Sequence, residues 1–150
     1  ELIRRCIIKL ENFITQKDIE VEANFEEEDM YVKADIDSIE RVLINLMHNA
    51  VKFVQQNGKI KVSTSSYKNK VLVCVEDNGI GIDRNEIDLI WERFYKSDKS
   101  RSKEKGGAGL GLAIVRNIIN DHKQEIWVES EVGKGTKFYF TLDKGSNEKA

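Results

Sequence analysis

The sequence predicts an α/β protein of the α+β type: a two-layer sandwich in which a mixed, mostly antiparallel sheet of about five strands packs on three helices. Two observations predict this class. The order of the elements gathers helices against a mostly antiparallel sheet, and the chain of 150 residues, with 40% apolar and 33% charged residues, suits one globular domain with a sizeable core.

The first third of the chain alternates between helix and strand patterns. Residues 1–15 carry one apolar helical face, and residues 19–25 alternate apolar and polar side chains with the period of a half-buried strand. Residues 26–29 form an acidic turn, and residues 31–34 are expected to form a short strand.

A long helix is expected from Asp37 to the Asn57-Gly58 pair, which is a stop and turn signal. Asp37 and Glu40 have the spacing of a capping box. The apolar stripe of this helix consists of Ile39, Leu43, Leu46, Ala50 and Phe53.

The middle of the chain predicts two antiparallel strands, residues 59–67 and 70–76, joined by a turn at residues 68–69. The second strand is apolar over residues 71–75 and should therefore lie in the middle of the sheet. Asp83 is expected to cap a helix that extends to about Phe94.

The last third predicts a polar loop over residues 96–107, a helix over 110–121 and strands over 125–129 and 136–142. The domain is expected to span residues 1–143, with a flexible lid at about 95–107. Residues 144–150 are expected to form a disordered tail.

Composition restricts the function classes. A net charge of −2 gives no electrostatic support for nucleic-acid binding, and no apolar stretch is long enough to span a bilayer, so no direct membrane contact is expected. Cys6 and Cys74 lack metal-site spacing and are interpreted as buried thiols in a reducing compartment. The opening at Glu1 suggests that the chain comes from the middle of a longer protein.

Three polar side chains share one face of the middle helix. At 100° per residue, Asn49 and Lys52 lie about 40° and about −20° from Asn45. An amide oxygen is a suitable ligand for Mg²⁺, and a lysine supplies positive charge to phosphates. A solvated face is the alternative interpretation of the same pattern.

The segment Glu76–Ile82 (EDNGIGI) follows the apolar strand directly. A carboxylate at this position can accept a hydrogen bond from an adenine amino group, and the two glycines allow close backbone approach. The sequence is also compatible with an ordinary tight turn.

Residues 106–113 (GGAGLGLA) contain four glycines that lead directly into a helix. Backbone N–H groups at such a start can bind an anion. The segment is not a Walker A loop, because no Lys-Ser or Lys-Thr follows, and it lacks the context of a Rossmann fingerprint. A flexible hinge is the alternative.

Residues 91–96 (WERFYK) precede the loop, where aromatic side chains can anchor it while Arg93 or Lys96 reaches a phosphate. Residues 96–105 hold five basic and two acidic side chains, an excess of three positive charges that suits a lid over polyphosphate. A disordered surface loop is the plain alternative. The glycine-rich turn at 132–136 says little by itself.

Together and in order, these segments resemble the catalytic domain of sensor histidine kinases, in the wider superfamily that includes gyrase-type and Hsp90-type ATPases. Residues 45–53 (NLMHNAVKF) resemble its N box, 77–81 (DNGIG) its first glycine box and 91–94 (WERF) its F box. Residues 107–112 (GAGLGL) and 133–136 (GKGT) are similar to its second and third glycine boxes. The resemblance covers essentially the whole chain and implies a Bergerat-type ATP-binding fold.

The resemblance also implies roles for single residues. Asn49 would ligate Mg²⁺ with Asn45 nearby, Asp77 would bind the adenine amino group with support from Thr136, and Arg93 and Lys96 would approach the γ-phosphate. The remaining residues implied to contact the nucleotide are Lys52, Phe53, Gly79, Gly81, Ile82, Tyr95, Gly107, Ala108, Gly109, Leu110, Gly111 and Leu112.

Three positions depart from the family pattern. Phe53 stands where Tyr is common, so a hydroxyl contact is lost, and Trp91 replaces Phe but keeps an aromatic anchor. Ala108 stands where Thr is frequent, which places a hydroxyl contact there in doubt. None of these departures removes a charge that the chemistry requires.

The implied function is binding of Mg-ATP and transfer of its γ-phosphoryl group to a histidine on a separate dimerisation domain of the same full-length protein, which then passes phosphate to a response regulator. His48 is interpreted as a structural residue and His122 as an exposed helix-end residue, so neither is expected to be the acceptor. The parent protein is expected to be membrane-anchored, with this domain in the cytoplasm.

Three alternatives remain open. One is another ATPase or a serine kinase of the same superfamily, although the box at 91–94 and its short gap to the second glycine box favour the histidine kinase. Another is a nucleotide-binding module without catalysis, against which intact Asn49, Asp77 and Arg93 weigh. The last is an α/β domain whose glycines only make turns.

Overall fold

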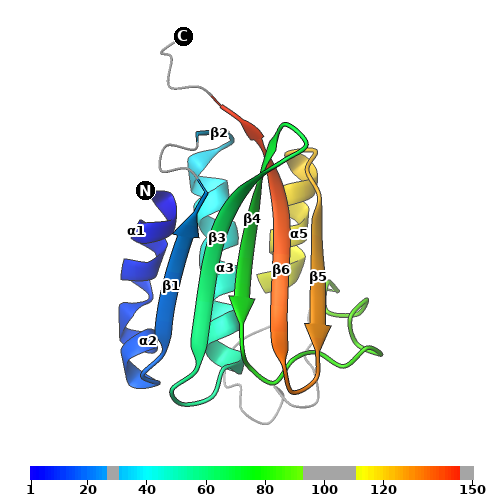
Figure 1. Cartoon of the computed structure of the whole chain (residues 1–150). Coiled ribbons are helices and arrows are strands. Elements are labelled where there is room, and N and C mark those ends of the chain that lie inside the picture. The colour runs from blue at the N-terminus through cyan, green and yellow to red at the C-terminus, as the bar shows by residue number, and fades with distance from the viewer. Residues whose placement is uncertain (27–30, 93–110, 146–150) are drawn as a thin grey trace.

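A computed structural model describes residues 1–26, 31–92 and 111–145. In this part of the chain, six strands form one mixed sheet, and helices α1, α2, α3 and α5 lie against one of its faces (Figure 1). The predicted two-layer α+β sandwich is confirmed.

The sheet has the order β1-β3-β4-β6, and β2 and β5 both pair with the edge of β6 that faces away from β4. The β1–β3 pair is parallel, and the other pairs in the described residues are antiparallel. The apolar strand β4 is central, as predicted. The strands are β1 Glu20–Phe25, β2 Val32–Lys33, β3 Lys59–Tyr67, β4 Lys70–Asp77, β5 Ile126–Glu131 and β6 Gly135–Lys144.

Along the paired strands β3, β4 and β6, the inner face changes from apolar side chains to polar ones at one end. Val75 pairs with Val62 on β3 and with Phe138 on β6, and all three side chains are buried beneath the helices. Two residues along β4, Asp77 pairs with Thr136. Because side chains alternate along a strand, Asp77 and Thr136 lie on the same inner face, at its end.

The single helix predicted over residues 1–15 is in fact two helices, α1 Leu2–Lys9 and α2 Glu11–Gln16. Leu10 separates them with φ −99° and ψ 7°, outside the α-helical region. The bend lets α2 reach α3, where the ring of Phe13 meets that of His48 edge-on at 5.3 Å.

Helix α3 spans Ile36–Phe53, and both of its predicted ends are corrected. Asp35 rather than Asp37 is the N-cap, because Asp35 is extended and its carboxylate accepts a hydrogen bond from the Ser38 amide. The helix ends four residues before Asn57, which adopts a left-handed φ of 64° in the following turn.

A lysine side chain stabilises the C-terminal end of α3. Lys17 Nζ donates to the carbonyl oxygens of Val51, Lys52 and Val54 at 2.8, 3.2 and 3.0 Å. These carbonyls lie where the helix dipole is negative and internal partners run out. Lys17 therefore fixes the end of the helix that carries the predicted polar face.

Replacing Lys17 by Met should lower the free energy of unfolding by about 1–3 kcal/mol, because charged hydrogen bonds to three carbonyls are lost while the aliphatic stem remains. Urea denaturation would measure the change. Lys134→Met is the control, since that side chain is 75% exposed and its pair with Glu131 should contribute little. Equal stability of the two variants would contradict the capping role.

The helix predicted from Asp83 is wrong for the described residues up to Glu92, which form successive turns. The amide of Glu86 donates to Asp83 O at 2.8 Å, and that of Leu89 donates to Glu86 O at 2.9 Å. Asp83 does cap the first turn, because its carboxylate accepts from the Asn85 amide. Ile90 of this segment is buried and Trp91 packs against the core, whereas Leu89 is exposed.

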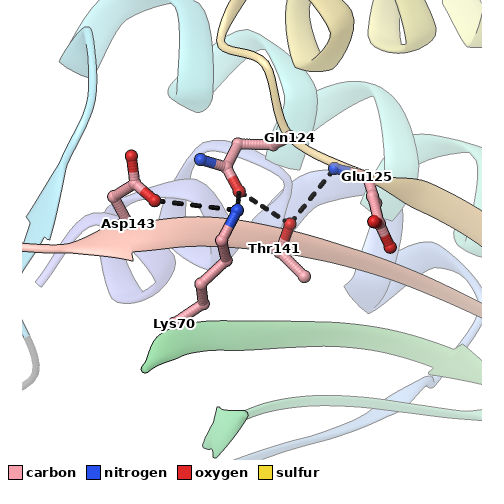
Figure 2. Close-up of polar contacts among 5 residues, drawn as sticks. All are labelled: Lys70, Gln124, Glu125, Thr141 and Asp143. Atoms are coloured by element: carbon pink, nitrogen blue, oxygen red, sulfur yellow. Dashed lines mark hydrogen bonds and ion pairs between the residues drawn. The ribbon is translucent and has the colours of Figure 1, made fainter. Parts of the chain in front are cut away.

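Helix α5 spans Gly111–Asp121, and the segment after it is tied to the sheet (Figure 2). Gln124 Oε1 accepts hydrogen bonds from Lys70 Nζ at 2.9 Å and from Thr141 Oγ1 at 2.8 Å, and Thr141 Oγ1 accepts from the Glu125 amide. Asp143 lies 3.7 Å from Lys70 Nζ. This network fixes the C-terminal end of α5 on the sheet and so helps to set the orientation of the helix.

His122 also links the C-terminal end of α5 to α3. It was predicted to be exposed, but it is half-buried. Its Nε2 accepts from the Asp35 amide at 3.2 Å, and its Nδ1 lies 2.9 Å from Ile118 O. The ring is half-buried between the last turn of α5 and the first of α3. His122 therefore joins α3 to α5.

The remaining boundaries differ little from prediction. Strand β6 extends to Lys144, one residue beyond the predicted domain end, and the Gly145 amide donates to Tyr31 O. Residues 146–150 lie outside the described part of the chain. Cys6 and Cys74 are buried, as predicted. Among the described helices, none combines the length and apolarity that crossing a bilayer requires.

Candidate functional site

Three segments meet at one end of the sandwich, the lower end in Figure 1: the C-terminal end of α3, the end of β4 and the β5–β6 turn. Helix α5 lies higher, with its N-terminal end directed toward them. The Ile80 amide donates to Phe53 O at 3.3 Å, and the Gly133 amide donates to Ile80 O at 2.9 Å. The segment after β4 is therefore held between α3 and the β5–β6 turn.

Glycines make this convergence possible. A Cβ atom at Gly79 would lie 2.4 Å from Phe53 O, and one at Gly81 would lie 2.2 Å from Glu131 O. A Cβ atom at Gly135 would lie 2.0 Å from Asp77 O. Gly81 and Gly135 also have positive φ values of 77° and 116°. Backbone packing thus accounts for Gly79, Gly81 and Gly135. For Gly79 and Gly81 the sequence resemblance implies contact with the base, and for Gly135 it implies no such role.

Asp77 is a buried carboxylate at the centre of this arrangement, with only 5% of its surface exposed. Its Oδ1 accepts from the Gly79 amide at 2.8 Å, and the Thr136 amide also donates to the carboxylate. Burial raises the pKa of Asp77 to about 6, although these two amides lower it. At neutral pH the group is an ionised acceptor with little access to water.

This raised pKa predicts a pH-dependent stability. Between its ordinary pKa of 3.8 and about 6, Asp77 binds a proton in the folded chain but not in the unfolded chain. Its contribution to stability is therefore complete below 3.8 and is lost as the pH rises through about 6, by up to about 3 kcal/mol.

The measurement is the difference in melting temperature between wild type and Asp77→Asn from pH 4 to pH 8, which cancels the titration of other groups. Wild type should lose stability relative to the variant as the pH rises and reach a plateau above about pH 7. A difference that stays constant over the whole range would contradict the raised pKa.

The predicted polar face of α3 borders this carboxylate end. Asn45, Asn49, Lys52 and Phe53 are all half-buried, between the apolar stripe and solvent. Lys52 Nζ lies 6.0 Å from the centre of the Phe53 ring. The face therefore has amide oxygens and an ammonium group at partial exposure, where an ion or a ligand can reach them.

Among the described residues, nothing lies within 4 Å of where a Cβ atom at Gly111, at the N-terminal end of α5, would be placed. Leu112 packs against the core. Gly111 thus differs from Gly79, Gly81 and Gly135. The predicted residues Arg93, Tyr95, Lys96, Gly107, Ala108, Gly109 and Leu110, with the lid at about 95–107, lie outside the described residues.

Trp91 and His48 both make aromatic ring contacts. Trp91 packs edge-on against Phe138 of β6, with ring centres 5.8 Å apart, so it does anchor its segment to the body. The guanidinium of Arg116 lies 5.9 Å from the centre of the Trp91 ring. His48 is exposed at the α2–α3 contact, in agreement with a structural role.

Sequence reasoning missed Ser130. Its hydroxyl accepts from the Ile82 amide at 2.7 Å and lies 2.9 Å from Gly135 O and 2.8 Å from Thr136 Oγ1. Strand parity could have found it, because Ile126, Val128 and Ser130 share one face of β5. A serine that continues an apolar alternation points inward, here beside Thr136.

Comparison with known proteins gives one consistent result. The sequence model of the family described as histidine kinase-, DNA gyrase B- and HSP90-like ATPase matches residues 34–146. The sensor histidine kinase WalK of Bacillus subtilis (strain 168) is 36% identical over 146 residues, which is 95% of this chain and 24% of WalK. The chain thus spans about a quarter of the length of this relative.

Solved structures show the same fold. The nucleotide-free catalytic domain of histidine kinase ThkA has a TM-score of 0.84 and 35% identity, covering 96% of this chain and 91% of that domain. ThkA in complex with the response regulator protein TrrA has a TM-score of 0.80 and 34% identity, covering 97% and 40%. Full-length ShkA in complex with AMPPNP has a TM-score of 0.85 and 27% identity, covering 97% and 30%.

Proposed function

The chain belongs to the histidine kinase-, DNA gyrase B- and HSP90-like ATPase family, and from this premise we propose that it binds Mg-ATP at the carboxylate end of its sheet. We further propose that it transfers the γ-phosphoryl group to a histidine on a separate dimerisation domain of the same full-length protein. The fold and the relatives are those of sensor-histidine-kinase catalytic domains.

One observation carries the proposal. A buried, ionised carboxylate at residue 77 lies at the end of β4, where the following segment is held between α3 and the β5–β6 turn. Within the described part of the chain this carboxylate accepts from two backbone amides, and a carboxylate has lone pairs for a further donor. The amino group of adenine is such a donor, so the residues present fit the base.

The polar face of α3 fits the metal and the phosphates. Asn49 would hold Mg²⁺ through its amide oxygen with Asn45 beside it, and Lys52 would attract the phosphates. Bound Mg²⁺ would neutralise charge that accumulates on the phosphate oxygens. Phe53, Gly79, Gly81 and Ile82 would border the base, and Thr136 would support Asp77.

The start of α5 would receive the triphosphate. Amides at a helix N-terminus and the helix dipole favour an anion, and among the described residues no atom lies where a side chain at Gly111 would point. By resemblance, Gly107 to Leu110 with Leu112 would surround the phosphates, Tyr95 would contact the nucleotide, and Arg93 and Lys96 would approach the γ-phosphate.

Phosphoryl transfer depends on position and charge more than on covalent participation of the protein. The residues of this chain would hold the base with Asp77 and orient the triphosphate between α3 and α5. Their cations would stabilise the charge on the group in transit. The acceptor histidine would come from the dimerisation domain, since His48 and His122 serve contacts between helices.

Partners and location are proposed by analogy with the relatives. The structure of ThkA with TrrA favours a response regulator as the recipient of phosphate from the full-length protein. We also propose that this is a cytoplasmic domain of a membrane-anchored sensor, with the domain limits at 1–143 and a tail beyond them.

Mixing the domain with Mg-ATP and a separately made dimerisation domain tests the activity. Phosphate that is labile to acid and stable to base should appear on the acceptor domain, and a His→Ala change of the acceptor should abolish it. Tight nucleotide binding with no such phosphate would instead identify a nucleotide-binding module without transfer.

Asn49→Asp should weaken Mg-ATP binding about tenfold or more, because the added carboxylate at residue 49 would repel the negatively charged triphosphate. Calorimetric titration measures the affinity. Asn117→Asp makes the same change at an exposed position of α5 and should leave the affinity unchanged. If Asn49→Asp binds Mg-ATP like wild type, Asn49 is not near the metal.

A further inference from the structure

The Ser130 hydroxyl joins three segments of the site. It contacts the Ile82 amide on the segment after β4, and Gly135 O and Thr136 Oγ1 at the start of β6. The three distances are 2.7, 2.9 and 2.8 Å. Ser130 itself lies at the inner face of β5, half-buried.

The number of protons determines the direction of these bonds. Ser130 accepts from the Ile82 amide and has a single proton to donate. If that proton goes to Gly135 O, which can only accept, the 2.8 Å contact with Thr136 must use the Thr136 proton. All three contacts are then satisfied. The opposite direction would leave Gly135 O without its partner.

The Thr136 oxygen consequently keeps only acceptor capacity for a ligand. Thr136 is paired with Asp77 across β4 and β6, and its amide donates to the Asp77 carboxylate. The wall at this end of the sheet then presents two adjacent acceptors, a carboxylate and a hydroxyl oxygen, and both are buried.

We propose that Ser130 is a positioning residue for base selection: by holding the Thr136 hydroxyl as an acceptor beside Asp77, it favours adenine, whose amino group donates, over guanine, whose carbonyl oxygen accepts. The inference rests on the proposed function, since it concerns the same nucleotide. Ser130 acts on the base through Thr136 and Ile82 and does not itself touch the reacting atoms.

Loss of this hydroxyl should change selectivity and not only stability. In Ser130→Ala, the Thr136 proton becomes free to point toward the ligand, and the Ile82 amide loses its acceptor. ATP affinity should fall about tenfold, while GTP affinity should change less than about twofold, so the ratio of the two should fall with the ATP affinity.

The experiment measures the affinities of the domain for Mg-ATP and Mg-GTP by calorimetry. Ser130→Thr keeps the hydroxyl and should restore the wild-type ratio. Ser65→Ala removes a half-buried hydroxyl from the opposite face of the sheet and should leave the ratio unchanged. In a Thr136→Val background, Ser130→Ala should have little further effect on the ratio, because the group through which it acts is absent.

The outcomes separate this inference from the function on which it rests. A wild-type domain that binds neither nucleotide overturns the proposed function. In a second outcome, the wild type prefers ATP while Ser130→Ala keeps the same ratio of ATP to GTP affinity, with or without an equal loss of both affinities. That result overturns the role of Ser130 and leaves the proposed function standing. Should Ser130→Ala fail to fold, Ser130→Cys keeps a similar volume with much weaker hydrogen bonds, and the same expectations apply to it.

Discussion

Asp77→Asn is expected to remove most of the stabilisation that Mg-ATP gives to the domain. At a ligand concentration of 100 times the dissociation constant, wild type should gain about 2.7 kcal/mol, equivalent to several degrees in melting temperature. A 100-fold loss of affinity would reduce this gain to about 0.4 kcal/mol. The reason is that an ionised acceptor is replaced by an amide, which cannot accept at both of its polar atoms.

Glu76→Gln is the matched control for this experiment. Glu76 is the adjacent carboxylate, but it lies on the outer face of β4, where its side chain is 41% exposed and 3.9 Å from Lys137. Its neutralisation should leave the ATP-induced shift unchanged. Equal shifts in wild type and Asp77→Asn would remove the assignment of Asp77 to the base.

Gly135→Ala should destabilise the domain by about 4 kcal/mol or more, enough to leave a large fraction unfolded in a protein of ordinary stability. Two costs combine at this position. An alanine would be strained at a φ of 116°, and its Cβ atom would lie 2.0 Å from the carbonyl oxygen of Asp77. That oxygen belongs to the last residue of the central strand β4, whose backbone is paired on both sides and cannot move freely.

Gly133→Ala separates the two costs. Gly133 has a φ of 85°, but a Cβ atom there would meet nothing within 4 Å. Its substitution should therefore cost only about 1–2 kcal/mol, the strain alone. Urea denaturation of both variants measures the difference. If Gly135→Ala were no less stable than Gly133→Ala, close packing of β4 against the start of β6 would not be the reason for the glycine.

The fold was predictable where the pattern of apolar residues decides the structure. The continuous apolar run in β4 placed it in the middle of the sheet, and the turn at Lys68-Asn69 has the left-handed conformations that a tight hairpin needs. The predictions failed where a contact between distant parts of the chain, rather than the local sequence, determines where an element ends. The end of α3 depends on Lys17, which is 34 positions before Val51 in the chain and gives no local signal.

The same distinction holds at the site. The place of Asp77 at the end of a buried strand could be predicted from the apolar run before it, and the helical period placed Asn45 and Asn49 on one face. Their contacts with the nucleotide stay predictions. The reason for Gly79 and Gly81 could not be predicted, since it lies in carbonyl groups of α3 and β5 that only the fold brings near. Ser130 was missed because the predicted strand stopped at residue 129, which left Ser130 out of the alternation that places it on the inner face of β5.

The central claim is that α3, the end of β4 and the start of α5 form one site for ATP and its metal ion. A crystal structure of the domain with Mg²⁺ and a non-hydrolysable ATP analogue tests it directly. The adenine amino nitrogen should lie within about 3.2 Å of the Asp77 carboxylate, with the phosphates between the Asn49 face and Gly111. An analogue bound elsewhere, with its base away from Asp77, would contradict the account.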